Sequence, residues 1–246
     1  MLLVPGGTFT MGADKEGELD ERPAHEVTVG AFYLDATEVT NEAYNRCVTA
    51  KKCEPKDGRV GMWMLPRHPV TGVRWDDGKA YCEWVDKRLP TEAEFERAVR
   101  GTDGRRFPWG NDKPREELTV ALGRSGPLEV GSKPKGIGPY GHHDLAGNVW
   151  EWVNDLYDPY AYRRTGAKDG KPGSCDEIME ALADIKKSGK GGFTGTNPIT
   201  ECERAIRGGA YNYPANGLRA TNRVHHPGRW RLRMTGFRCA AACAER

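Results

Sequence analysis

The feature that most constrains this chain is the segment at residues 141–155, which reads Gly-His-His-Asp-Leu-Ala-Gly-Asn-Val-Trp-Glu-Trp-Val-Asn-Asp. Asp144 and Glu151 flank a Gly-Asn turn, and together they can fold one oxygen-rich loop around a hard cation. Trp150 and Trp152 alternate with Glu151, so on a strand the two rings face the side opposite the acid. The segment therefore predicts a polar face that can hold a cation and an aromatic face that packs into a core.

The composition predicts an irregular fold that is rich in loops. Hydrophobic residues make up 37% of the 246 residues, and 31 glycines and 16 prolines accompany seven tryptophans. No repeat or clear linker divides the chain, so we expect a single domain over residues 1–246. The net charge of +2 gives no indication of a nucleic-acid partner, and no apolar run is long enough to span a membrane.

Seven cysteines are many for a protein of the reducing cytosol. Cys47 and Cys53 are spaced for a local disulfide, and a bond between Cys175 and Cys202 would close a polar insertion at about residues 160–200. We therefore expect an exported protein, located in the periplasm, in the cell envelope or outside the cell. The start of the chain is too short to be a signal peptide, so the targeting segment is expected to be absent from this sequence.

The other cysteines give different expectations. Cys82 lies on a face of an expected helix and is predicted to be a buried free thiol. Cys239 and Cys243 are four residues apart, a spacing that a flat strand cannot bridge directly.

Periodicity and capping residues predict the regular elements. Thr40 caps one helix, and Thr91 with Glu94 forms a capping box for another, which Gly101 ends. Alternation of polar and apolar residues predicts the strands. The expected helices cover residues 40–48, 76–85, 91–101 and 176–187, and the expected strands cover residues 2–4, 8–12, 25–29, 32–35, 205–207 and 235–239, with a long polar loop between the last two.

Eight short motifs, which follow one another in order along the chain, resemble the sulfatase-modifying-factor family. The founding member of that family is the formylglycine-generating enzyme. The resemblance implies an α+β fold related to C-type lectin-like domains, with little regular secondary structure, and it covers the chain outside the polar insertion. The motifs are VPGGTFTMG at residues 4–12, EVTN at 38–41, PVTGVRW at 69–75, RLPTEAEFE at 88–96, FPWG at 107–110, DLAGNVWEW at 144–152, RGG at 207–209 and GFRC at 236–239.

The same resemblance implies a calcium ion bound by Asp144, Gly147, Val149 and Glu151. Two carboxylates and two turn carbonyls, completed by water, are a reasonable start toward the six to eight oxygens that calcium prefers. The alternative is that the two carboxylates cap amides of their own turn and hold no metal. A second calcium site of the family should fall at residues 119–128, where few side chains carry oxygen, so we expect that site to be lost.

The residues that carry out the chemistry of the family are replaced in this chain. The enzyme uses two cysteines and bound copper, for which soft thiolates are suitable ligands. Tyr213 and Leu218 occupy the positions of the two cysteines, and Ala210 occupies the position of the serine that handles oxygen. We therefore expect neither copper binding nor formylglycine generation.

The loop that should hold the active site is rich in residues suited to contact surfaces. Its arginines indicate a ligand that carries a carboxylate, sulfate or phosphate, unless they pair internally with acids such as Glu203 or Asp155. The side chains of the adjacent His225 and His226 would point to opposite faces of a strand, so this pair cannot chelate one metal ion without a kink. Within residues 211–233 the candidate ligand-binding residues are Tyr211, Asn212, Tyr213, Asn216, Arg219, Arg223, His225, His226 and Trp230.

Three functional hypotheses follow. The first is a non-catalytic binding module, stabilised by calcium, that presents residues 211–233 to a protein, peptide or glycan. The same scaffold and the same Arg-Gly-Gly and Gly-Phe-Arg boundaries occur in variable ligand-binding proteins of diversity-generating retroelements. The second is an oxidase of a different chemistry, like the periplasmic pyoverdine-tailoring oxidase of the family, which also lacks the cysteine pair. The third is a scaffolding subunit of an envelope complex that docks through the insertion.

Overall fold

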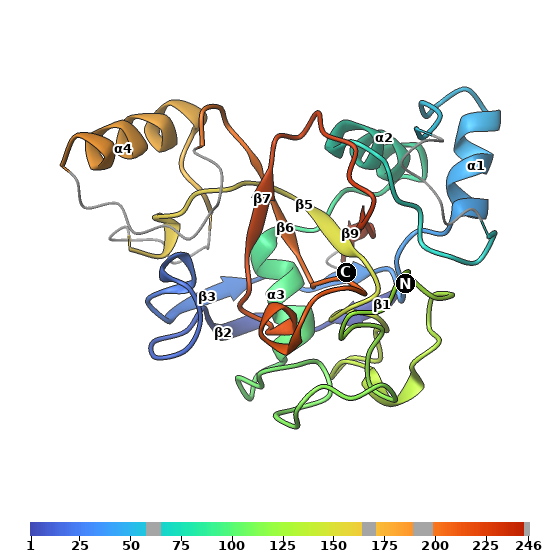
Figure 1. The fold of residues 1–246 in the computed structure, drawn as a ribbon, viewed down its shortest axis with the longest axis horizontal. Coiled ribbons are helices and arrows are strands. Elements are labelled where there is room, and N and C mark those ends of the chain that lie inside the picture. Colours follow the sequence, from blue (N-terminus) through green and yellow to red (C-terminus); the bar gives the residue numbers. More distant parts are fainter. Residues whose placement is uncertain (58–64, 164–170, 189–198, 244–246) are drawn as a thin grey trace.

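The computed structural model describes residues 1–57, 65–163, 171–188 and 199–243, which form an α+β fold with three small sheets (Figure 1). The first sheet has the order β1 (Leu2–Val4), β4 (Phe32–Leu34), β9 (Ala240–Ala242) and brings both ends of the chain together. The second is the hairpin of β2 (Gly7–Met11) and β3 (His25–Val29). The third has the order β7 (Val224–His226), β6 (Arg204–Arg207), β5 (Trp150–Leu156), β8 (Thr235–Gly236), and only the β5–β8 pair is parallel.

The helices begin where their caps predict. Thr40 accepts a hydrogen bond from the Ala43 amide at the start of α1 (Asn41–Thr49), and Thr91 caps α3 (Glu92–Arg100) in the same way. Helix α3 ends at Gly101, whose φ of 61° suits glycine. The other helices are α2 (Trp75–Trp84) and α4 (Cys175–Ser188), and single turns of 3₁₀ helix occur at Leu19–Glu21, Pro134–Gly136, Ala161–Arg163 and Ala215–Leu218.

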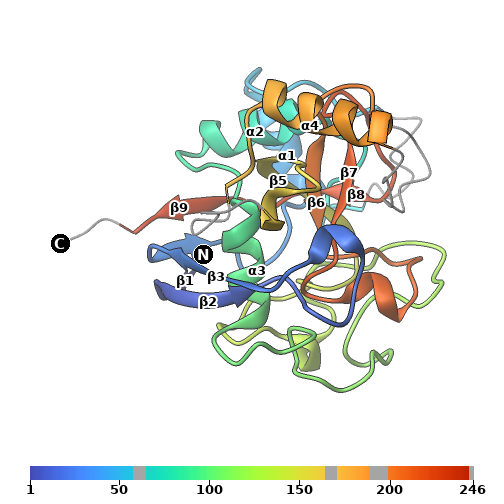
Figure 2. The ribbon, with the colours of Figure 1, turned by 90° about the vertical axis from the view of Figure 1, so that its left-hand side faces the viewer.

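Helix α3 lies between the β2–β3 hairpin and the four-stranded sheet, as Figures 1 and 2 show. Because both sides of the helix are covered, even its charged residues Glu92, Glu96 and Arg97 are buried. Buried charges require partners, and α3 therefore becomes the centre of an ion-pair network.

Strand β5 contains Trp150 and Trp152, the two tryptophans that are predicted to pack into the core. Trp150 and Trp152 are 2% and 0% exposed, which confirms the aromatic core. The indole N–H of Trp152 donates to the carbonyl of Val73, and that of Trp75 donates to the carbonyl of Val153. Glu151 is equally buried, so the face of β5 that carries the acid is an interior face rather than a solvated one.

Three disulfides connect six cysteines of the described residues. The predicted Cys47–Cys53 and Cys175–Cys202 bonds are present. The prediction of a free thiol at Cys82 is wrong, because Cys82 bonds to Cys239, which is 157 residues further along the chain. Helix α2 packs beside the last strands, and the Cα atoms of the two cysteines are 5.6 Å apart there, a proximity that local sequence does not encode.

The polar insertion contributes the predicted helix α4, which Figure 1 shows on the side of the molecule opposite α1. Two parts of the predicted insertion, residues 164–170 and 189–198, lie outside the described residues. Within the described part of the chain, no helix is long and apolar enough to cross a membrane.

Candidate functional site

A network of buried ion pairs supports the C-terminal part of the fold. Arg207 of β6 binds both Glu92 and Glu96, at 3.1 and 2.5 Å. Arg223 binds Glu92 through two parallel hydrogen bonds of 2.7 and 2.8 Å. Although burial opposes ionisation, Arg223 and Arg207 lower the pKa of Glu92. The carboxylate is therefore held as an anion, and α3 is tied to the segment that precedes β7.

A cleft of about 760 Å³ lies above this network, beside β7. Seven of the nine predicted ligand-binding residues line it: Tyr213, Asn216, Arg219, Arg223, His225, His226 and Trp230. Tyr211 and Asn212 do not line it. Tyr211 is buried and its main chain bonds to Arg124 and Asn148, whereas Asn212 is exposed outside the cleft.

Sequence reasoning missed several residues of the cleft. Glu18 and Asp20 come from the N-terminal loop and Tyr157 from the end of β5, and no local pattern marks them as neighbours of residues 211–233. Glu201 and Glu203 lie just before β6 and also line the cleft, and Glu203 is one of the acids expected to pair with an arginine. The remaining lining residues are Thr200, Pro214, Gly217, Asn222, Val224, Pro227 and Arg229.

The arginines of the cleft are paired internally, which was the alternative expectation, but with other partners. Arg219 binds Glu21 at 2.6 Å and Arg223 binds Glu92, so the suggested partners Glu203 and Asp155 are wrong. Glu21 and Glu92 lie on elements far away in sequence and contact the arginines only after folding. Arg229 forms an exposed pair with Glu201 at 2.5 Å. Arg231 likewise pairs with Asp77 at 3.2 Å, so four of the five arginines on which the expectation of an anionic ligand rests are held in internal ion pairs.

Aromatic rings line the cleft in stacked pairs. His225 stacks on Tyr157 with ring centroids 4.0 Å apart, and His226 stacks on Trp230 at 5.2 Å. His225 also binds Glu203, with 2.5 Å between Nδ1 and Oε2. The two histidines thus contact different partners, as expected for neighbours on a strand. Among the residues that the structure describes, no three histidine, cysteine, aspartate or glutamate side chains form a possible metal-binding group.

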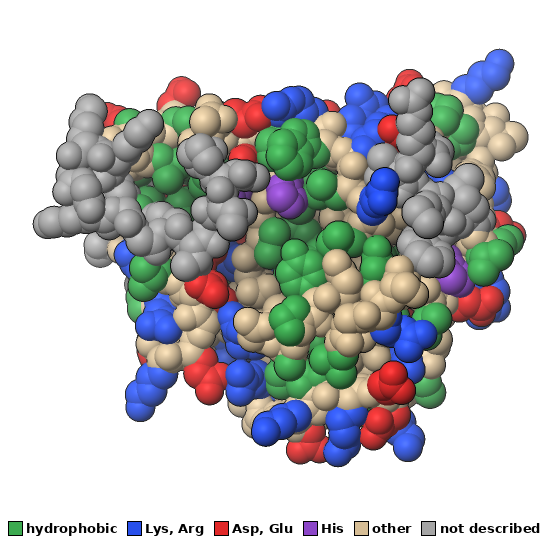
Figure 3. Space-filling view, in the orientation of Figure 1, with side chains coloured by type: hydrophobic (Ala, Val, Ile, Leu, Met, Phe, Trp, Pro, Cys, Tyr) green, Lys and Arg blue, Asp and Glu red, His purple; other side chains and the backbone are tan. Residues whose placement is uncertain are grey.

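Hydrophobic side chains and a histidine gather in the middle of the molecular face that carries β7 (Figure 3). A second, smaller pocket of about 340 Å³ adjoins the cleft, because Tyr213, Val224 and His226 line both. The ring of Tyr213 packs edge-on against Trp150 at 5.0 Å. The other residues that line this pocket are Ile206, Arg231, Leu232, Arg233, Met234 and Thr235.

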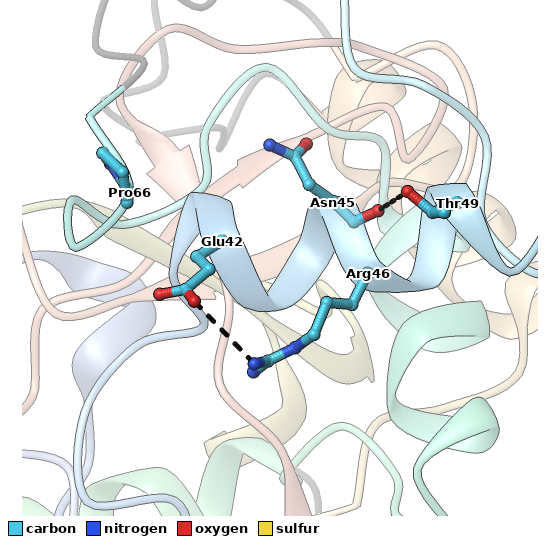
Figure 4. A pocket seen from close by; sticks show the side chains of 5 residues that line it. All are labelled: Glu42, Asn45, Arg46, Thr49 and Pro66. Carbon is cyan, nitrogen blue, oxygen red and sulfur yellow. Dashed lines mark hydrogen bonds and ion pairs between the residues drawn. The ribbon is translucent and has the colours of Figure 1, made fainter.

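A third hollow, on α1, is an ordinary part of the surface. Figure 4 shows its lining residues, among them Glu42 and Arg46, which form an exposed ion pair of 3.9 Å. The hydroxyl of Thr49 donates to the carbonyl of Asn45 within the same helix. These interactions stabilise a helix and leave no buried polar group for a ligand.

The positions at which the family resemblance implies cysteines carry no thiol in this chain. Leu218 is buried and packs with Phe107, Ala121 and Ala146, while Ala210 is fully buried under the loop. Six cysteines are in disulfides, and Cys243 at the end of β9 is the free cysteine of the described residues. The described part of the chain therefore brings no pair of free thiolates together in the cleft.

Asp144 and Glu151 lie in one buried cluster, and Glu151 is on the side of β5 opposite the tryptophans. Arg238 donates two hydrogen bonds of 2.7 and 2.8 Å to Glu151. Asp144 accepts a hydrogen bond of 2.6 Å from the amide of Gly131, so the two acids bind groups outside their own turn. Both oxygens of the buried Glu38 carboxylate are without a hydrogen-bond partner. Burial, Asp144 and Glu151 raise the pKa of Glu38, so three acids here share one guanidinium.

Comparison with known proteins agrees with this geometry. Residues 1–243 match the family described as Sulfatase-modifying factor enzyme 1-like domain, FGE-sulfatase. The chain belongs to this family. This match confirms the family and the fold that the sequence motifs predict. Because the formylglycine-generating enzyme (FGE) gives the family its name, we refer to the chain as an FGE-like domain.

The relatives of this FGE-like domain differ in what their names state. The Serine/threonine-protein kinase pkn1 of Chlamydia pneumoniae is 33% identical over an alignment of 260 positions, which covers 98% of this chain and 37% of the kinase. The chain thus spans little more than a third of the length of that relative. The Inactive C-alpha-formylglycine-generating enzyme 2 of Mus musculus is 31% identical over 65% of this chain and 70% of its own.

A solved structure supports the assignment. PvdO from Pseudomonas aeruginosa aligns with a TM-score of 0.73 and 26% identity, and the alignment covers 98% of this chain and 93% of PvdO. The FGE-like fold therefore extends over almost the whole chain, including the cleft beside β7.

Proposed function

We propose that the FGE-like domain is a non-catalytic binding module that takes a protein, peptide or glycan into the cleft formed by residues 211–233. The proposal depends on Tyr213 and Leu218, which stand where the family resemblance implies two cysteines, and on the packing of Leu218 in an apolar cluster. The name of the inactive mouse relative is consistent with such a loss. Loops that a rigid scaffold holds, with exposed aromatic residues, are suited to binding.

Two assays test this function. The protein, incubated with a Cys-x-Pro-x-Arg peptide and copper, should yield no formylglycine by mass spectrometry, and appearance of the aldehyde would refute the non-catalytic role. In a pull-down from the native envelope, the Trp230→Ala variant should lose partners that the wild type retains. Tyr33→Ala is the matched control, because Tyr33 is an aromatic residue with the same exposed fraction of 38% on β4, outside the cleft. Equal loss in both variants would contradict binding through the cleft.

We also propose that the protein is exported. The three disulfides are those of a protein that folds in an oxidising compartment. A binding module of the periplasm, the envelope or the cell exterior would meet its partner there.

Calcium is proposed as the stabiliser of the floor of the fold. Asp144 and Glu151 would supply carboxylate oxygens, and Gly147 and Val149 would supply main-chain carbonyls, with water completing the shell. The surplus of acids around Arg238, with Glu38 unpaired, fits a cation at this place. When bound, the ion would neutralise charge and hold the turn against β5.

Chelation tests the calcium proposal. EGTA should lower the melting temperature of the wild type, and added calcium should restore it. The Asp144→Asn variant should lose this response, because asparagine tolerates the φ of 56° at this position but removes the charge. A wild type whose melting temperature ignores EGTA would disprove the site.

An oxidase of a different chemistry is the second candidate. The His225–Glu203 pair inside the cleft favours it. A histidine held by a carboxylate is a common arrangement for proton transfer. A scaffolding subunit that docks through the insertion is the third, and finding the partner on α4 instead of the cleft would support it.

A further inference from the structure

The smaller pocket that adjoins the cleft has an apolar interior. Its volume of about 340 Å³ is at the lower end of the range for small-molecule sites, so it has room for one ring system or a short alkyl chain. The apolar side chains that line it belong to, or pack against, one hydrophobic cluster: Trp150, Ile206, Tyr213, Val224, Leu232 and Met234. Transfer of an apolar group from water into this space is therefore favourable.

One positive charge at the smaller pocket is free. Arg231 and Arg233 are the charged residues that line it, and no aspartate or glutamate of the described residues does so. Arg231 is bound to Asp77 at 3.2 Å. Arg233 is exposed, and in the described part of the chain it forms no ion pair. Burial lowers the pKa of His226, which also lines the pocket, so this imidazole is mostly neutral at pH 7 and the unpaired charge belongs to Arg233.

The backbone around Arg233 is fixed to the rest of the fold. The carbonyl of Leu232 accepts a hydrogen bond of 2.9 Å from the amide of Gly72. The carbonyl of Met234 accepts one of 2.7 Å from the amide of Trp150. Arg233 lies between these two anchored residues, so the scaffold holds it beside the apolar space. The planar fork of a guanidinium matches the two oxygens of a carboxylate, so this place suits a carboxylate on an apolar body.

A buried donor in the wall of the same pocket also lacks a partner. Trp150 is 2% exposed, and within the described residues its indole N–H has no hydrogen-bond partner. The indole N–H groups of Trp75 and Trp152 each donate to a main-chain carbonyl. Because an unsatisfied buried donor is unfavourable, an oxygen atom supplied by a ligand would gain a hydrogen bond at Trp150.

We propose that the smaller pocket binds a small amphipathic anion, a monocarboxylate whose apolar body fills the pocket and whose carboxylate pairs with Arg233. This ligand is additional to the macromolecular partner proposed above, so neither proposal depends on the other.

Isothermal titration calorimetry with two pairs of probes tests the inference. Naphthoate and octanoate carry the carboxylate on a ring system and on an alkyl chain, and naphthalenemethanol and octanol are their neutral counterparts. At least one of the anions should bind with a single site per chain, about fivefold more tightly than its neutral counterpart, as expected for an ion pair at the mouth of a pocket. The anion that binds more tightly identifies the apolar body as a ring or a chain.

Two variants and a control locate the site. Arg233→Gln should weaken binding of the anion about fivefold and leave binding of the neutral probe unchanged. Arg115→Gln is the matched control, because Arg115 is an exposed arginine of a loop that lines neither the cleft nor the smaller pocket. This control should bind the anion like the wild type. Val224→Trp should fill the pocket with a ring and abolish binding of both probes.

Equal affinities of the wild type and Arg233→Gln for the anion would overturn the inference, as would a wild type that binds neither anion at millimolar concentration. A Val224→Trp variant that melts like the wild type and still binds would overturn it as well. If Val224→Trp does not fold, the comparison of Arg233→Gln with Arg115→Gln decides the matter alone. None of these failures changes the result expected for Trp230→Ala in the pull-down, so they are distinguishable from failure of the macromolecular binding function.

Discussion

The disulfide between Cys82 and Cys239 should contribute more to stability than any other covalent link in the described structure. It joins helix α2 to the segment between β8 and β9, and both cysteines are fully buried. A disulfide stabilises mainly by restricting the unfolded chain, and the restriction grows with the length of the closed loop. The perturbation is the double variant in which both cysteines are alanine.

The magnitude follows from the loop lengths. With a sequence separation of 157, chain entropy assigns about 5 kcal/mol to the Cys82–Cys239 bond. The Cys47–Cys53 bond, with a separation of 6, is assigned about 2 kcal/mol. All four cysteines are buried, so replacement by alanine leaves cavities of similar size in both double variants. The difference of about 3 kcal/mol between the variants therefore isolates the loop length.

Urea unfolding followed by tryptophan fluorescence measures this difference. Both double variants and the wild type should be compared at one pH and one calcium concentration, with midpoints converted through the slope m. For a chain of this length the longer loop should also cost about 6–12 °C more in melting temperature. Non-reducing peptide mapping of the wild type should find the Cys82–Cys239 link and one alkylated thiol, at Cys243.

The reasoning is refuted if the Cys47 and Cys53 double variant loses as much stability as the Cys82 and Cys239 variant, or more. An alkylated Cys82 in the wild type would refute the connectivity itself.

Three further perturbations test the interior. Burial, with the nearby Glu92, raises the pKa of Asp155 from 3.8 to about 7, so the contribution of Asp155 to stability is present below pH 3.8 and is lost as the pH rises through 7. In urea unfolding between pH 4 and 8, the Asp155→Asn variant should therefore lose about 4 kcal/mol less stability than the wild type. An equal loss of stability in both proteins would contradict this prediction. Arg223→Leu removes the side chain that donates two hydrogen bonds to the buried Glu92, so it should lower the free energy of unfolding by about 3–5 kcal/mol in calorimetry. Arg229→Leu, which breaks an exposed ion pair, should have a much smaller effect. Gly147→Ala should cost about 2 kcal/mol or more in thermal melts, because φ is 105° and the new Cβ would meet Thr119 Oγ1 at 2.2 Å; native-like melting would refute this.

Local features of the chain were predictable wherever neighbouring residues supply the interactions. The caps at Thr40 and Thr91 place α1 and α3, and the spacing of Cys47 and Cys53 gives their bond. The alternation around Trp150 predicts the core strand. Each of these depends on contacts within a few positions, so the sequence carries the whole signal.

The candidate site was predictable only in part. Residues 211–233 supply one wall, and seven of the nine chosen residues line the cleft. The predicted long polar loop contains β7, because a three-residue strand is defined by its pairing with β6 and leaves little pattern of its own. Arg219 and its partner Glu21 are 198 positions apart, and no spacing rule connects them.

The sequence by itself determined the family and the order of the motifs, because these depend only on which residue stands at which position, and it predicts that Tyr213 and Leu218 replace the cysteine pair of the family. Tertiary structure alone decided which charges neutralise one another, which cysteine meets Cys82, and that a pocket lies beside β7, the outermost strand of its sheet in the described part of the chain. Those outcomes depend on long-range packing of α3 and α2 against the final strands, where burial forces each charge to find a partner wherever the fold provides one. The segment around Asp144 and Glu151 illustrates the difference. Its residues identify the family, whereas the charge around its carboxylates depends on Glu38 and Arg238, which come from distant positions in the sequence.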